Sequence, residues 1–176
     1  MNRNLFFTPT DILLPAHADM RRWSVIACDQ FTADAGYWQT VQDTVGDAPS
    51  TLRLMLPEFY LGKCDEAAAT REIQQTMRRY LDDGVFRTVP HSLVLVQRTL
   101  PGGAVRCGVV GALDLEAYDS APDSVTPIRA PEGTVASRLP ARVRIRPAAA
   151  LEMPPLMVFY RHPDDTHRRE APAAAG

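Results

Sequence analysis

Lysine is almost absent from this chain. Lys63 is the single lysine among 19 basic residues, so arginine carries nearly every positive charge. The 21 acidic residues bring the formal net charge to -2. Proteins that neutralise a nucleic-acid backbone normally present a cationic face, so this balance argues against a nucleic-acid partner and leaves only a local basic site open.

Cysteine and long apolar runs are also scarce. The three cysteines, Cys28, Cys64 and Cys107, are far apart and lack CxxC spacing, which argues against a disulfide framework and a zinc knuckle. No stretch approaches the roughly 20 apolar residues of a transmembrane helix, and no apolar run of signal-peptide length occurs near the start. We therefore expect a cytoplasmic protein with reduced thiols and no membrane partner.

Length and composition indicate one globular domain. The chain has 176 residues, of which 45% are hydrophobic and 23% charged, and both values are typical of globular proteins. A domain of this size buries roughly two-thirds of its unfolded surface in one core. The final RHPDDTHRREAPAAAG is charged and then low in complexity. We predict a single α+β domain over residues 1–162 and a disordered tail over 163–176.

Two stretches have the periodicity of helices. The apolar residues of DAGYWQTVQDTVG recur at helical spacing, with Thr32 or Asp34 as N-cap and Gly46 as the stop. A second helical repeat runs from Asp65 to Asp83, and Gly84 closes it.

Several other stretches are typical of strands. In HSLVLVQRTLPGGAVRCGVVGALDL, strands Leu93–Thr99 and Val105–Leu113 are joined by a Pro-Gly-Gly turn, which predicts an antiparallel hairpin. The apolar runs SVIAC (24–28) and LMVFY (156–160) are also predicted strands. Together these elements indicate an α+β fold with a mixed, largely antiparallel sheet, at least one hairpin and two main helices.

Arginine is concentrated in IRAPEGTVASRLPARVRIRP, which holds five arginines in twenty positions. RVRIR alternates, so a strand there would place Arg142, Arg144 and Arg146 on one face. Because arginine is a permanently charged bidentate donor, this face is a candidate cradle for phosphate or carboxylate groups. The alternative is that the arginines form the solvated side of an edge strand.

The candidate site combines those arginines with the neighbouring EGT turn. Glu132 is the candidate catalytic residue, either as a base for a substrate hydroxyl or as a Mg²⁺ ligand. Gly133 would let the backbone approach a ligand, and Thr134 would donate to it. Asp29 and Glu58 border apolar stretches, where they either enter a site or cap a turn. The predicted substrate- or phosphate-binding residues are Arg129, Gly133, Thr134, Arg138, Arg142 and Arg144.

Three other groups have two interpretations. Cys28 is either an activated thiol or a packing residue at the end of an apolar run. HPDDTH (162–167) either holds a metal ion or is solvated. Trp23, Tyr37 and Trp38 are either core aromatics or a surface on which a substrate stacks.

Two long segments resemble a known family. They are DILLPAHADMRRWSVIACDQFTADAGYWQTVQDTVGDAPSTLRLMLPEFYL and IRAPEGTVASRLPARVRIRPAAALEMPPLMVFY. With the motifs WSVIACDQFT and EGTV, they are similar to the N-terminal half of the uncharacterised prokaryotic family catalogued as domain of unknown function 1015. The similarity covers residues 10–160.

This resemblance implies a function. The second half of family members carries an aspartate-glycine and histidine signature that resembles the site of free-serine kinases in the ParB-like superfamily. It therefore implies a small-molecule phosphotransferase of the hydroxy amino acid type, with an arginine-rich anion site, a small anionic or phosphorylated ligand, and Mg²⁺ with ADP or ATP as cofactors. None of the four histidines here follows an Asp-Gly step, so we expect this chain to be inactive alone.

The resemblance also leaves an alternative. A truncated, non-catalytic homologue would at most bind anions or a partner. If a second half normally covers this one, the chain exposes an apolar surface near Leu156–Tyr160 and self-associates through it.

Overall fold

The computed structural model describes residues 6–121, 123–129, 136, 139–153 and 157–158. Its helices are α1 (Met20–Trp23), α2 (Ala35–Val45), α3 (Glu66–Asp82) and α4 (Leu139–Ile145). Its 3₁₀ turns are η1 (Thr51–Leu54), η2 (Glu58–Tyr60), η3 (Leu115–Ala117) and η5 (Arg146–Ala148). Its strands are β1 (Phe7–Thr8), β2 (Thr10–Pro15), β3 (Phe86–Ser92), β4 (Val94–Thr99), β5 (Val105–Val110), β6 (Ala112–Leu113), β7 (Tyr118–Asp119) and β8 (Ile128–Arg129). Within these residues no helix is both long and apolar enough to span a membrane.

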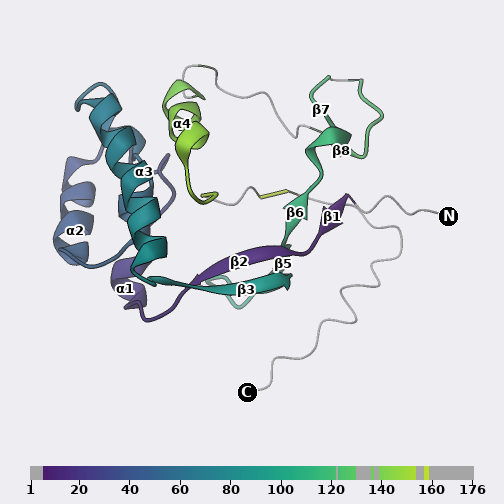
Figure 1. The fold of residues 1–176 in the computed structure, drawn as a ribbon, viewed down its shortest axis with the longest axis horizontal. Helices are drawn as coiled ribbons and strands as arrows, with labels where there is room; N and C mark the ends of the chain where they lie inside the picture. Colours follow the sequence, from purple (N-terminus) through teal and green to yellow (C-terminus); the bar gives the residue numbers. More distant parts are fainter. Residues whose placement is uncertain (1–5, 122, 130–135, 137–138, 154–156, 159–176) are drawn as a thin grey trace.

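The strands are paired two by two. β1 pairs with β6, β2 with β3, and β4 with β5, all antiparallel, whereas β7 and β8 are parallel. Figure 1 shows the helices gathered at one end and the β2–β3 ribbon leading from them toward β1 and β6. The predicted α+β class with largely antiparallel pairing is therefore confirmed, although the described strands form separate ribbons and not one larger sheet.

The two predicted helices are confirmed, together with their end signals. The Asp34 side chain accepts a hydrogen bond from the Tyr37 N–H at 2.9 Å at the start of α2, and Gly46 ends this helix at φ 52°. The Asp65 carboxylate caps α3, and Gly84 follows the helix at φ 66°. Positive φ costs glycine little, which is why it stops both helices.

The core lies where α3 packs against α1, η1 and the start of β3. Trp23 meets Phe86 edge to face, with ring centroids 5.4 Å apart. Trp23 and Trp38 are both buried, so their interpretation as core aromatics is confirmed, while Tyr37 is half-buried and stacks on Phe31. The buried core cluster is Trp23, Leu54, Ile73, Met77 and Tyr80.

The predicted strand at SVIAC is wrong. Residues 24–27 have no regular secondary structure, and residue 28 lies in a turn. Ser24 caps the end of α1, and the segment then lies along α2, where Val25 and Ile26 line a small groove with Tyr37 and Val41. Its apolar side chains thus pack against a helix, and no strand pairs with it among the residues that the structure describes.

The predicted strand at RVRIR is also wrong, because Leu139–Ile145 forms α4. Successive residues of a helix turn by about 100°, so the alternating arginines cannot share one face as they would on a strand. α4 lies beside α3 in Figure 1, and its Ile145 packs against the core cluster. Gln74 of α3 donates to the Ile145 carbonyl, so the last turn of α4 is also satisfied from outside the helix.

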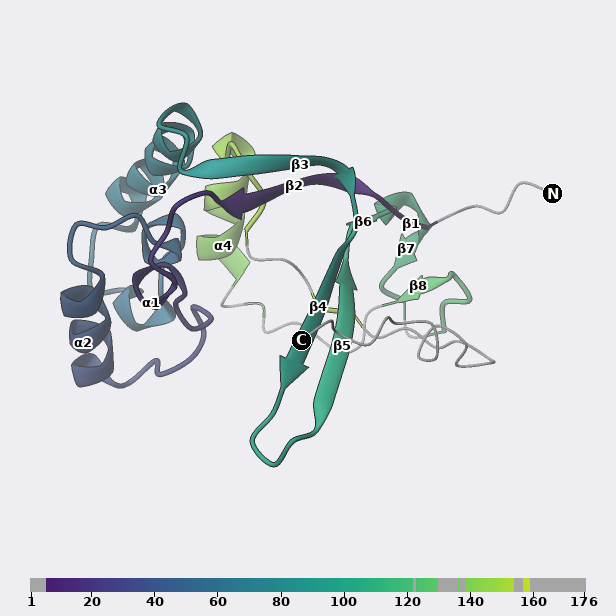
Figure 2. The same ribbon diagram turned by 90° about the horizontal axis from the view of Figure 1, so that it is seen from below.

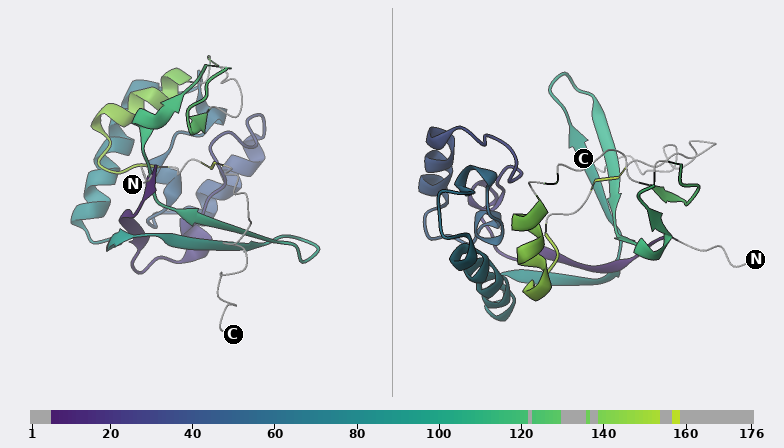
Figure 3. Two further views of the ribbon diagram at one scale, coloured as in Figure 1. Left: turned by 90° about the vertical axis from the view of Figure 1, so that its right-hand side faces the viewer. Right: turned by 90° about the horizontal axis from the view of Figure 1, so that it is seen from above.

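The predicted hairpin is confirmed, with its second strand ending earlier than expected. β4 and β5 pair from Val94↔Val110 to Thr99↔Val105, and Gly102 and Gly103 turn the chain at φ 93° and 86°. Figures 2 and 3 show this hairpin projecting away from the helices. The predicted strand at 156–160 lies mostly outside the described residues. Its described members, 157 and 158, are exposed and not in a strand.

Gly111 marks the point where the base of the hairpin meets the N-terminal strand. A Cβ added to Gly111 would lie 2.7 Å from Leu93 Cδ2, from Phe7 Cζ and from the Thr8 carbonyl oxygen. Backbone cannot yield as a side chain can, so a close approach to this carbonyl needs glycine.

We expect Gly111→Ala to lower the free energy of unfolding by about 1–3 kcal/mol through overpacking. Gly108→Ala is the matched control, because an added Cβ on Gly108 in β5 meets nothing within 4 Å. The control should be neutral or slightly stabilising. Urea denaturation measures both, and equal unfolding free energies for the two variants would contradict this account of Gly111.

Candidate functional site

The arginines of α4 contact acidic residues from distant parts of the chain. The Arg142 guanidinium donates to Glu58 Oε1 at 2.8 Å and lies 3.6 Å from Asp29 Oδ2. Glu58 begins η2, and Asp29 lies in the loop before α2. One guanidinium therefore joins two carboxylates that are far apart in sequence, which we call the Arg142 cluster.

A backbone hydrogen bond brings those two carboxylates to the same place. The Glu58 N–H donates to the Cys28 carbonyl at 2.8 Å, which joins the loop bearing Asp29 to the start of η2. The side chain of Glu58 is only 9% exposed, whereas those of Asp29 and Arg142 are 37% and 47% exposed. The cluster thus has one nearly buried carboxylate and two groups open to solvent.

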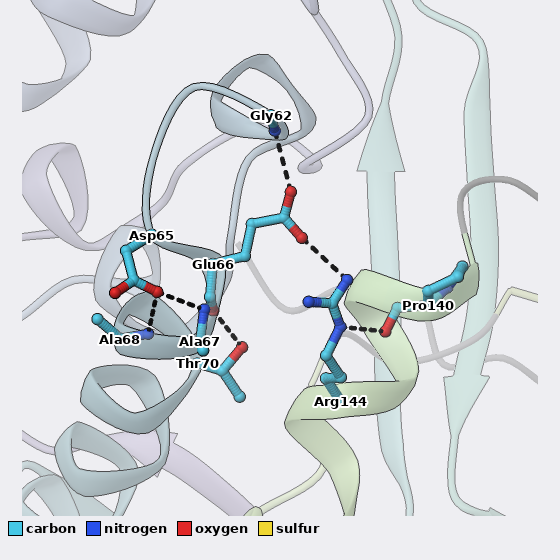
Figure 4. A network of polar contacts seen from close by, with 8 residues as sticks. All are labelled: Gly62, Asp65, Glu66, Ala67, Ala68, Thr70, Pro140 and Arg144. Atoms are coloured by element: carbon cyan, nitrogen blue, oxygen red, sulfur yellow. Dashed lines mark hydrogen bonds and ion pairs between the residues drawn. The ribbon is translucent and has the colours of Figure 1, made fainter.

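Arg144 makes a second pair, shown in Figure 4. Its Nη2 donates to Glu66 Oε2 at 2.9 Å, and its Nε donates to the Pro140 carbonyl at 3.2 Å. The other carboxylate oxygen of Glu66 accepts the Gly62 N–H at 2.9 Å. Because Glu66 is the first residue of α3, its charge also lies at the positive end of that helix.

Other contacts attach the C-terminal end of α4. Gln74 Nε2 donates to the Ile145 carbonyl at 2.9 Å, and Arg78 Nη2 donates to the Ala148 carbonyl at 3.0 Å. These bonds satisfy carbonyls that a helix end leaves without intrahelical partners. Arg146 pairs separately with Glu152 at 2.6 Å, and both of these side chains are more than half exposed.

Two groups at the Arg142 cluster, the Cys28 thiol and the Arg142 guanidinium, have pKa values raised above their ordinary values. Burial raises the pKa of the Cys28 thiol, Arg142 lowers it, and Asp29 and Glu58 raise it again. The net rise keeps Cys28 protonated at neutral pH and argues against an activated thiolate. For Arg142, burial lowers the pKa, but the negative charge of Cys28, whose thiol is ionised at the high pH where arginine titrates, and the charges of Glu58 and Asp29 raise it above its ordinary value. This guanidinium therefore stays charged at neutral pH.

A groove of about 560 Å³ is lined by residues of α2, η1, η2 and α3. Asp43, Arg53 and Glu72 line it together with apolar residues of α2 and α3. Pro57 and Tyr60, on either side of Glu58 in the chain, also line it, but none of the predicted site residues that the structure describes does.

The predicted site residues fall into three groups. Arg142, Glu58 and Asp29 are brought together, with Arg144 on the same short helix. Arg129 is exposed on β8, which lies apart from α4 in Figures 1 and 2. The remaining predicted residues lie outside the described part of the chain: Glu132, Gly133, Thr134 and Arg138. The candidate metal-binding HPDDTH lies outside it as well.

Sequence reasoning missed Glu66 as a partner of Arg144. Glu66 comes directly after the cap residue Asp65. An acidic residue at this position is typical of a helix start, so it does not by itself indicate a tertiary partner. Its pairing with Arg144 depends on the docking of α4, for which the sequence carries no local signal. Among the described residues, no group of three or more His, Cys, Asp or Glu side chains is arranged to hold a metal ion.

The N-cap of α3 gives a testable pH dependence. Hydrogen bonds from the N–H of Ala68, and to a lesser extent Ala67, lower the pKa of Asp65, although slight desolvation opposes them. A carboxyl whose folded-state pKa is depressed stabilises the fold above its unfolded pKa of about 3.9 and loses this effect as pH falls through the folded value.

Asp65→Asn keeps an oxygen acceptor but loses the charge. We therefore expect the unfolding free energy of this variant to fall less than that of the unmodified chain between neutral and acid pH. Urea denaturation across that range measures the slope of unfolding free energy against pH. If the unfolding free energy of Asp65→Asn falls with decreasing pH as steeply as that of the unmodified chain, the Asp65 charge is not linked to folding.

Comparisons with known proteins place the chain in a family. Neither the curated proteins nor the solved structures contain a match to it. A family model described as "Protein of unknown function (DUF1015)" matches residues 9–175, which is most of the chain. The protein therefore belongs to the DUF1015 family.

Proposed function

We propose that this chain carries the substrate-binding part of a small-molecule phosphotransferase that acts on a free hydroxy amino acid. The observation that carries the proposal is the Arg142 guanidinium, held between Glu58 and Asp29 and still open to solvent. The reaction class is supported by the resemblance of the second half of family members to free-serine kinases, and the charges of the cluster support the type of ligand.

Arg142 and Asp29 suit the two charged ends of a free amino acid. A guanidinium presents five N–H donors in a planar fork, so it can bind a ligand carboxylate or phosphate while it keeps a protein contact. The partly exposed carboxylate of Asp29 suits an ammonium group. Glu58 orients the guanidinium, which is the positioning that binding in a defined geometry requires.

The chemical step is assigned from the sequence. Glu132, Gly133 and Thr134 precede α4 in the chain, and we propose Glu132 as the base for the substrate hydroxyl or as a ligand of Mg²⁺. Bound Mg²⁺ would neutralise charge on a phosphoryl group that passes from ADP or ATP to the substrate hydroxyl, with AMP or ADP as the leaving group. Arg129, Arg138 and Arg144 are proposed as further contacts to anionic groups.

One observation favours the non-catalytic alternative. Arg142 and Arg144 each already contact a carboxylate of the protein, as they would if their role were to fasten α4. In that case the chain binds anions or a partner at most, and the loss of either arginine changes stability and not ligand affinity.

Titration calorimetry with L-serine and O-phospho-L-serine, repeated with Mg²⁺ and ADP, tests the proposal. We expect Arg142→Ala to weaken ligand binding by about 1.5–3 kcal/mol, because a charge-assisted contact is lost. Arg142→Lys should recover only part of this loss, since an ammonium cannot reproduce the guanidinium fork.

Arg146→Ala is the matched control, because Arg146 follows α4 directly and pairs with Glu152 outside the Arg142 cluster. It should leave ligand affinity unchanged. Absence of binding by the unmodified chain, or equal losses in Arg142→Ala and Arg146→Ala, would count against a ligand site at Arg142 and favour the fastening role.

A further inference from the structure

Phe31 has a backbone conformation that a residue with a side chain rarely adopts. Its φ is 50°, and among the described residues only His91 shares a positive φ without being glycine. His91 lies where the β2–β3 register shifts, and an irregularity of that kind accommodates such a φ. Phe31 lies in the loop before α2 and outside any strand. The conformation is strained there, and it persists only where the surroundings enforce it.

The surroundings hold both the backbone and the ring of Phe31. Its carbonyl accepts hydrogen bonds from the Trp38 indole N–H and from the Asp34 backbone N–H, each at 3.1 Å. Trp38 is fully buried, so this donor has a fixed position. The Phe31 ring stacks on Tyr37, with centroids 4.1 Å apart and ring planes at 15°. Tyr37 in turn meets Trp38 edge to face at 5.3 Å, which joins the stack to the interior.

The ring that these contacts hold is still exposed. Phe31 is 47% exposed although Tyr37 covers one face of its ring, so much of the remaining surface is open to solvent. Burial of apolar surface is the main gain from packing a phenylalanine, and Phe31 forgoes a large part of it. Core packing therefore does not account for the strain. Strained residues cluster at ligand contacts, where a side chain is held in place before the ligand arrives.

The exposed ring lies close to the Arg142 cluster. Because consecutive Cα atoms are about 3.8 Å apart, the Cα atoms of Phe31 and Asp29 lie within about 7.6 Å of each other. The Asp29 carboxylate is 3.6 Å from the half-exposed Arg142 guanidinium. A flat apolar ring and a guanidinium together suit a ligand that carries both a planar ring and negative groups. A nucleotide has both, whereas serine has no ring for Phe31 to contact.

We propose that Phe31, supported by Tyr37, is the surface on which the purine base of ADP or ATP stacks. The inference rests on the proposed function, because that function supplies the nucleotide and places anionic groups near Arg142. It goes further by giving the site a preference for nucleotides over phosphate compounds that lack a base. Stacking uses the flat face of the base, so the contact needs no hydrogen bond to the base edge.

Titration calorimetry of the full chain with ADP and with pyrophosphate, which lacks a base, tests this role. The unmodified chain should bind ADP at least about fivefold more tightly than pyrophosphate. Phe31→Leu keeps an apolar side chain but loses the planar ring. It should weaken ADP binding at least about fivefold and leave pyrophosphate binding unchanged. Phe31→Tyr keeps the ring and should retain the affinity for ADP.

Tyr118→Leu is the matched control, because Tyr118 is 44% exposed and lies on β7, apart from α2 in Figures 1 and 2. It should leave ADP binding unchanged, and circular dichroism checks that every variant folds. The proposal is overturned if Phe31→Leu binds ADP as tightly as the unmodified chain, or if Tyr118→Leu causes an equal loss. Absence of ADP binding by the unmodified chain overturns it as well.

A parallel titration with L-serine separates this inference from the proposed function. If Arg142→Ala weakens L-serine binding while Phe31→Leu leaves ADP binding unchanged, the stacking role of Phe31 is wrong and the proposed function stands. If Phe31→Leu weakens ADP binding while the unmodified chain does not bind L-serine, the base contact stands and the assignment to a hydroxy amino acid is wrong.

Discussion

The nearly buried carboxylate of Glu58 sets the central constraint on this structure. A carboxylate removed from water is costly unless a positive group accompanies it. Arg142 supplies that group at 2.8 Å, and to reach it α4 must return to a site formed much earlier in the chain. Because the Glu58 N–H is bonded to the Cys28 carbonyl, the same contact also holds the loop that carries Asp29. One ion pair thus fixes the positions of α4, η2 and the loop before α2 relative to one another.

Local signals made part of this fold predictable. α2 and α3 have an aspartate cap, a helical repeat and a terminal glycine, and the β4–β5 turn has two adjacent glycines at positive φ. The β2–β3 ribbon lacked such signals. Its strands are separated by α1, α2 and α3, and each contains a proline. Contacts between residues far apart in the chain decide this pairing, so a short stretch of sequence does not predict it.

RVRIR shows why residue alternation alone is an ambiguous signal. Alternating arginine and aliphatic residues suit a strand, but the same residues also satisfy a short helix when its surroundings supply carboxylates on more than one side. Arg142 meets Glu58, Arg144 meets Glu66, and Ile145 meets the core. The sequence indicated Arg142, Arg144, Glu58 and Asp29 as separate candidates, and tertiary contacts bring Arg142 to Glu58 and Asp29. Their role in binding a ligand stays a prediction.

The way α4 is anchored bears on whether its arginines are free to act on a ligand. Ile145, Ala149 and Leu151 pack against the core cluster, and Gln74 binds the Ile145 carbonyl. These contacts hold the C-terminal end of the helix and the turn after it without help from Arg142 or Arg144. The partly exposed pair of Arg144 and Glu66 stabilises the fold by about 0–1 kcal/mol, whereas the nearly buried Glu58 carboxylate depends on Arg142 for its countercharge. The proposed anion site therefore requires a ligand that shares the Arg142 guanidinium with Glu58, whereas at Arg144 it requires a ligand that displaces Glu66.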